Sequence, residues 1–154
     1  MNTYAIDKEF PDCFPDDFKD NILPQDARPE ELTVYRGCKT GIIDKNTFLS
    51  SYEEIIIKGI DSLNPNDRKK YEKNLKKPGF YGTSCFLDSE ELKDIMDSSW
   101  QRHKDAKILI GTMKCEDGLS QQTINRTAGC KHKSHVDWWL YKNSDPSTYF
   151  KEVE

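Results

Sequence analysis

Five short apolar segments, each bounded by glycine, proline or polar residues, constrain the fold of this chain more than any other feature. These segments are Leu32–Gly37, Phe80–Leu87, Lys107–Met113, Val136–Tyr141 and Tyr149–Val153. They are rich in β-branched and aromatic residues and have the length of strands. Strands that follow one another without long crossovers favour antiparallel or mixed pairing. The sequence therefore predicts an α+β fold.

Helices are expected mainly in the first half of the chain. Ser51 and Glu54 have the S-x-x-E spacing of a capping box ahead of an isoleucine-rich run, which predicts a helix there. Pro65 begins a second, basic helix, because proline is tolerated in a first turn. The Pro78-Gly79 pair ends it. Asp88 is placed to cap a third helix.

The chain length of 154 residues fits one domain, 1–154, with an acidic leader over 1–31 and a body over 32–154. The leader carries nine acidic and three basic residues, a net charge of −6, whereas the body sums to +2. The prolines of the leader disfavour a long helix there. Phe10, Phe14 and Phe18 indicate that the leader packs on the body.

The five cysteines are odd in number, and no two have C-x-x-C spacing. Reduced thiols in a cytoplasmic protein are the simplest interpretation. We expect no membrane contact, because no apolar run approaches about 18 residues. Zinc-binding residue types do recur late in the chain, but their spacing matches no zinc motif and we expect no metal. They are Cys115, Cys130, His132, His135 and Asp137.

Three groups of residues have the character of a binding or catalytic site. Arg36 lies on a strand, is followed by Gly37, and offers a planar fork to a phosphate or carboxylate. The strand Tyr81–Phe86 carries small hydroxyl residues and a glycine that permits close approach of a ligand. His135 and Asp137 share one face of a strand beside two tryptophans. A carboxylate in such surroundings is suited to acid–base tuning.

The order of these groups resembles the arginine–serine–glutamate class of ADP-ribosyltransferases over residues 32–154. The resemblance implies a split, two-sheet core that clamps NAD between its halves. The family's strand arginine matches Arg36, its serine strand matches Tyr81–Phe86, and its E-x-E motif matches His135-Val136-Asp137. It further implies that a carboxylate stabilises the oxocarbenium-like sugar formed when the nicotinamide–ribose bond breaks.

The resemblance assigns site residues in three sets. The catalytic set is Arg36, Ser84, His135 and Asp137, with Ser84 or Thr83 orienting the acid. The NAD-binding set is Tyr35, Arg36, Gly37, Tyr81, Gly82, Thr83 and Phe86. The loop 118–133 matches the acceptor-recognition loop, and its amide and basic side chains suit a nucleic acid. The acceptor-binding set is Asn125, Arg126, Lys131 and His132.

This chain departs from the family pattern at two positions. Asp137 is one methylene shorter than glutamate, and a misplacement of about 1 Å can reduce a rate on the order of 100-fold. His135 replaces the first glutamate, which suits a different acceptor. Two other matches to the family motifs are weaker. Glu152-Val-Glu154, as the E-x-E motif, has no strand after it, and Phe48–Ser51, as the serine motif, leads straight into a helix.

We therefore expect an NAD-dependent ADP-ribosyltransferase that modifies a protein or nucleic acid. Its small size is typical of a toxin or phage-defence effector with an antitoxin or inhibitor partner. Two alternatives remain open. One is a catalytically dead binding module of the same fold. The other is an RNase-like toxin that uses Arg126, His132 and His135 without NAD.

Overall fold

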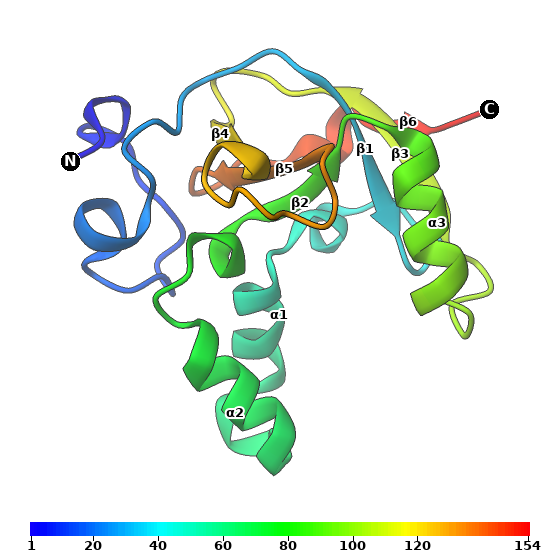
Figure 1. The fold of residues 1–154 in the computed structure, drawn as a ribbon, viewed down its shortest axis with the longest axis horizontal. Helices are drawn as coiled ribbons and strands as arrows, with labels where there is room; N and C mark the ends of the chain where they lie inside the picture. Colours follow the sequence, from blue (N-terminus) through cyan, green and yellow to red (C-terminus); the bar gives the residue numbers. More distant parts are fainter.

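The protein, described over residues 1–154 by a computed structural model, is built on one antiparallel sheet in the order β4-β5-β2-β1-β3-β6 (Figure 1). Every neighbouring pair of strands is antiparallel, and helices stand outside the sheet, so the predicted α+β class is confirmed. The strands are β1 (Thr33–Cys38), β2 (Thr83–Phe86), β3 (Lys107–Thr112), β4 (Gly118–Gln122), β5 (His135–Leu140) and β6 (Lys151–Glu152).

The sheet is weakly joined at its middle. A single residue pair, Tyr35 with Phe86, connects β1 to β2. By contrast, the β1–β3 ladder has six pairs and the β2–β5 ladder has four. The strands thus form a single sheet, rather than the two expected from the family resemblance, in which two three-stranded halves, β4-β5-β2 and β1-β3-β6, are joined through this one pair.

Three α-helices accompany the sheet: α1 (Ser51–Lys58), α2 (Pro65–Asn74) and α3 (Ser89–Ser99). The capping box of α1 uses Ser50 and Glu53 rather than the predicted Ser51 and Glu54, because Ser50 is the residue still in extended backbone. In Figure 1, α1 and α2 lie below the sheet and α3 lies at the end opposite the leader.

Three predicted strand boundaries were wrong. Phe80 and Tyr81 belong to a 3-10 turn over Pro78–Tyr81, because Pro78 begins that turn. Residues 118–122, predicted as loop, form β4, where leader residues provide partners for polar side chains. The closing strand shortens to Lys151–Glu152 because Pro146 begins a turn that ends at Tyr149.

The leader packs on the body, as its aromatic residues predict. Phe10, Phe14 and Phe18 are buried together with Tyr81 and Trp139 in one core. Only short 3-10 and π turns occur in the leader, consistent with its prolines. Arg28 pairs with Ser120, so the end of the leader extends the sheet beyond β4.

Two cores cover opposite faces of the sheet, and β5 contributes a tryptophan to each. Trp139 belongs to the leader-side core, whereas Trp138 belongs to a second core with Val34 and Cys85. Because side chains alternate along a strand, Asp137 lies on the same face as Trp139. Both faces of β5 are therefore covered. No helix has the length and apolar character needed to cross a bilayer.

Candidate functional site

A cavity of about 620 Å³ is lined by residues of β1 and β2. This volume lies within the roughly 300–1,000 Å³ of small-molecule sites. β1 contributes Arg36 and Gly37, and β2 with its preceding turn contributes Ser84 and Gly82. The remaining walls come from residues before and within α1 and from the end of α3: Cys38, Lys39, Thr40, Asp44, Asn46, Thr47, Leu49, Ser51, Glu54, Ile57, Lys58 and Trp100.

The Arg36 guanidinium is held in this cavity by backbone carbonyl groups rather than by a carboxylate. Its Nε donates to the Thr47 carbonyl at 3.1 Å, and Nη2 donates to Thr47 at 2.9 Å and to Leu49 at 3.3 Å. Nη1 donates to the Ser84 carbonyl at 2.8 Å. Burial lowers the pKa of Arg36, which stays charged because the ordinary value is so high. Arg36 therefore brings a positive charge with no direct counter-ion.

The segment Thr47–Leu49 is clamped by both halves of the sheet. Arg36 of β1 donates hydrogen bonds to the Thr47 and Leu49 carbonyls. The buried Thr83 hydroxyl of β2 donates to the Phe48 carbonyl between them. Thr83 thus positions the wall of the cavity and does not line it. Ser50, which follows directly, caps α1.

Asp137 lies outside the cavity, in a closed network of side chains on the leader-side face. It is 1% exposed. Its Oδ2 accepts hydrogen bonds from Arg126 Nη2 at 2.7 Å and from Thr123 Oγ1 at 2.8 Å. Arg126 also donates to Gln121, whose amide donates to Asp26 of the leader at 2.6 Å. The negative charge of Asp137 is therefore already neutralised within the protein.

His135 joins the same network through Thr123. Its Nδ1 lies 2.6 Å from Thr123 Oγ1 and 3.9 Å from Asp137 Oδ1. The threonine hydroxyl donates its one proton to Asp137, so it must accept from His135, which carries its proton on Nδ1. Burial lowers the pKa of His135 despite the opposing effect of Asp137. A neutral imidazole therefore faces this network at neutral pH.

Gly82 separates the cavity from Asp137. It lines the cavity, and a Cβ at this position would lie 3.2 Å from the Asp137 Cβ and 3.4 Å from Oδ1. Ser84, two residues further along β2, pairs with Asp137 across the ladder. Arg36 and Asp137 thus lie on either side of one strand, with only a glycine between the carboxylate and the cavity.

Besides Thr83, three further residues assigned to NAD binding do not line the cavity. Tyr81 is buried in the leader-side core, and its hydroxyl donates to the Leu75 carbonyl. Phe86 is buried beneath His135, with ring centroids 5.1 Å apart. Tyr35 lies at the single pair that joins the two halves.

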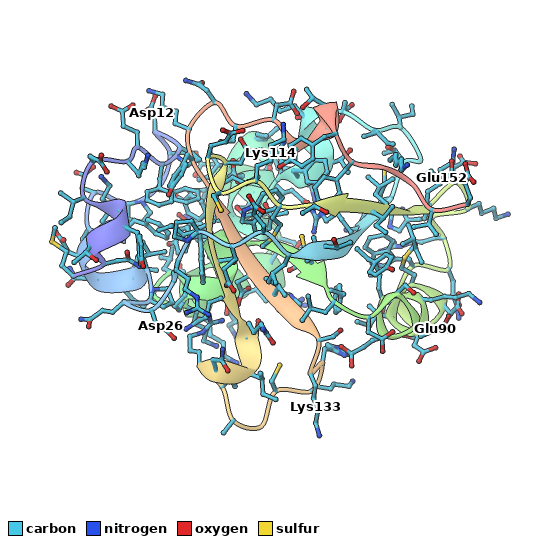
Figure 2. All side chains as sticks on the ribbon, turned by 90° about the horizontal axis from the view of Figure 1, so that it is seen from above. Asp12, Asp26, Glu90, Lys114, Lys133 and Glu152 are labelled. Atoms are coloured by element: carbon cyan, nitrogen blue, oxygen red, sulfur yellow. The ribbon has the colours of Figure 1, made fainter.

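The predicted acceptor residues are spread over the loop that follows β4. Arg126 is bound to Asp137 rather than free for an acceptor. Asn125 lines a small polar pocket of about 150 Å³ with Asp26 of the leader. Lys131 is exposed, and the His132 ring lies 6.3 Å from Phe86. Figure 2 shows the loop projecting from the sheet, with Lys133 on it.

Of the two alternative motif assignments, Phe48–Ser51 does contribute to the cavity wall, through Leu49 and Ser51, whereas Glu152-Val-Glu154 does not. Glu152 is in the edge strand β6 and pairs with Lys107 at 3.1 Å, away from the cavity walls. Glu154 is exposed. No group of three or more His, Cys, Asp or Glu side chains is placed to hold a metal ion.

Glu54 and Trp100 are among the cavity residues that sequence reasoning did not assign to the site. Glu54 is on α1, and its negative charge opposes the lowering of the Arg36 pKa by burial. Trp100 follows the last turn of α3 and packs on Gly37. The available signal for Trp100 was its isolation, since the other tryptophans form a pair in an apolar strand.

Comparison with models of protein families, with curated proteins and with solved structures found no match to this chain.

Proposed function

We propose that this protein binds NAD in the cavity between β1 and β2 and transfers its ADP-ribose group to a macromolecular acceptor, a protein or a nucleic acid. The observation that supports the proposal is that Arg36 and Ser84 both line that cavity, where Arg36 Nη1 donates to the Ser84 carbonyl. Order along the chain is consistent with it, because the arginine, serine and carboxylate strands are neighbours in the sheet.

The charges of the cavity suit a dinucleotide diphosphate. Three cationic residues, Arg36, Lys39 and Lys58, line it against two acidic ones, Asp44 and Glu54, and Arg36 has no carboxylate partner. Nη1 makes a single contact with Ser84, so one of its hydrogens is free to donate to a phosphate oxygen. Charge-assisted bonds of this type are among the strong ones. The arginine would hold the middle of NAD and so orient the bond that breaks.

The reaction breaks the bond between nicotinamide and C1′ of the ribose, and the leaving nicotinamide takes the bonding electron pair. The ribose becomes oxocarbenium-like and is captured by an acceptor nucleophile, which loses its proton. A carboxylate near the ribose stabilises the developing positive charge more than the ground state. In our proposal, Ser84, which pairs with Asp137 across the β2–β5 ladder, orients the acid.

Two carboxylates are candidates for this role. Asp137 occupies the place implied by the family resemblance but is shielded by Gly82 and paired with Arg126. To act in catalysis, the Asp137 carboxylate must break its ion pair with Arg126 and contact the ribose instead. Glu54 is exposed and already lines the cavity. Asp137→Asn and Glu54→Gln distinguish them, because only loss of the acting carboxylate lowers the rate on the order of 100-fold.

The test is release of free nicotinamide from NAD, measured by chromatography, with and without total protein or total nucleic acid as acceptor. Ser84→Ala is expected to slow release, and Ser99→Ala, at the exposed end of α3, is the matched control. Labelled ADP-ribose should appear on one acceptor class. Absence of nicotinamide release under all of these conditions would refute the proposal.

A second candidate function is an NAD-binding module without catalysis. It is favoured by one observation, the pairing of buried Asp137 with Arg126, which leaves the proposed acid unavailable. NAD binding by calorimetry without nicotinamide release would establish this function in place of transfer.

A further inference from the structure

We propose that Trp100 and Lys39 form a subsite for the adenine base of the dinucleotide. This inference rests on the proposed function and assigns the orientation of NAD in the same cavity. Both residues line the cavity, and neither belongs to the three groups that carry the family resemblance.

The Trp100 ring is fixed in place by its neighbours. A Cβ on Gly37 would lie 2.5 Å from the indole, so a glycine is required for the ring to approach β1 this closely. The His103 ring packs edge-on with the Trp100 ring, with centroids 6.0 Å apart. The backbone of Trp100 is held to Met96 at the end of α3. The cavity therefore has a rigid aromatic wall.

Among the three tryptophans, Trp100 is the one left partly exposed. Trp138 and Trp139 are 1% and 0% exposed and belong to the cores. A partly exposed indole in a cavity is a stacking surface for a flat base, and such stacking contributes about 1–3 kcal/mol per base. The aromatic wall is thus suited to one end of a dinucleotide.

Lys39 determines which end. Its Nζ lies 5.2 Å over the Trp100 ring, and it makes no ion pair. The nicotinamide ring of NAD is positively charged and would be repelled by this ammonium group, whereas adenine is neutral. Lys39 is exposed and can leave the indole to meet a phosphate. Adenine is therefore favoured at Trp100.

The geometry along β1 agrees with this orientation. Trp100 contacts Gly37, and Lys39 lies two residues further along, whereas Arg36 contacts Ser84. With adenine against Trp100, the diphosphate passes Arg36 and the nicotinamide riboside lies beside Gly82 and Ser84. That end is the one nearest Asp137. One orientation thus satisfies the base, the phosphates and the reacting sugar.

The experiment follows Trp100 fluorescence and heat of binding in the full chain. AMP, ADP-ribose, NAD and nicotinamide mononucleotide are titrated separately. We expect the three adenine ligands to quench the emission and nicotinamide mononucleotide to leave it unchanged. The buried Trp138 and Trp139 serve as an internal reference.

Two substitutions test stacking against a merely structural role. Trp100→Ala should weaken AMP binding roughly 10-fold or more, and Trp100→Phe should restore part of it, because phenylalanine retains a ring face. Binding of nicotinamide mononucleotide should not change in either variant. Lys39→Met should weaken ADP-ribose but not adenosine. Urea unfolding of each variant separates loss of binding from loss of folding.

The outcomes separate this inference from the proposed function. If NAD binds Trp100→Ala as tightly as the unchanged protein, the subsite is refuted while transfer activity is untouched. If adenine ligands bind through Trp100 but no nicotinamide is released, the subsite stands and the transferase proposal fails. If no nucleotide binds, both are refuted.

Discussion

Arg36 and Asp137 are charged groups on neighbouring strands, yet the protein satisfies them in opposite ways. Arg36 donates to carbonyl groups of Thr47, Leu49 and Ser84, which are neutral, and it lines an open cavity. Asp137 is fully buried and paired with the guanidinium of Arg126. The β1 side therefore retains a positive charge for a ligand, whereas the β5 side has its charge matched from within.

This difference explains why one half of the proposed site is ready to bind and the other must rearrange to react. A buried carboxylate left without a partner is costly, so Arg126 stabilises the protein in the absence of ligand. A cationic ribose would offer Asp137 an alternative partner.

Replacing Arg126 by methionine should destabilise the protein most, by about 3 kcal/mol, because Asp137 is left buried and unpaired. Urea unfolding measures the change. Addition of Asp137→Asn should recover much of the loss, since the uncompensated charge is then gone. Equal loss in the single and double variants would show that the ion pair does not hold this region.

Replacing Arg36 by methionine should destabilise by about 2–3 kcal/mol, because the Thr47, Leu49 and Ser84 carbonyls lose their donor. Arg36→Lys keeps the charge but not the planar fork, and should recover only part of the stability. If thermal unfolding of Arg36→Met matches that of the unchanged protein, Arg36 does not hold the cavity wall.

Replacing Gly37 by alanine should cost about 1–2 kcal/mol, because the new Cβ meets the Trp100 ring and displaces it. Trp100 emission should shift at the same time. Gly129→Ala is the matched control, since no atom lies within 4 Å of a Cβ there. Similar unfolding curves for the two variants would mean that Trp100 is mobile rather than fixed.

The smallest effect concerns pH. The pKa of His135 is lowered in the folded protein by burial, so the unfolded chain binds its proton more readily. Stability should therefore be complete at neutral pH and fall as the pH drops below the ordinary histidine value of about 6.5. His135→Gln should flatten this part of the profile of unfolding free energy against pH. If the His135→Gln variant has the same dependence of unfolding free energy on pH as the unchanged protein, His135 is solvated rather than buried.

Local patterns predicted the strands better than the site. β1, β3 and β5 follow from apolar runs, and the leader's packing follows from its spaced phenylalanines. β4 was missed because Ser120 and Gln121 look like loop residues. Their polar groups are satisfied by Glu30 and Asp26, which lie far away in the sequence.

The site residues show the same limit. Arg36 and Ser84 were singled out because the strands that contain them could be recognised from the local sequence pattern. Both residues line the cavity. Arg126 was assigned to the acceptor because nothing local reveals its bond to Asp137. Trp100 lies outside every motif and reaches the cavity only through the packing of α3 against β1. Local sequence patterns do not reveal such contacts between segments that lie far apart along the chain.

The single residue pair between β1 and β2 has a mechanical consequence. Few ladder hydrogen bonds resist a change in the angle between the two halves, so the Tyr35–Phe86 pair can act as a hinge. Two features resist such opening: the hydrogen bonds from Arg36 and Thr83, on opposite halves, to Thr47–Leu49, and the core that Val34 shares with Cys85 and Trp138. A phosphate that draws Arg36 toward itself would weaken its hydrogen bonds to Thr47 and Leu49. The size of the bound ligand and the width of the cavity between β1 and β2 are therefore coupled through the Arg36 guanidinium.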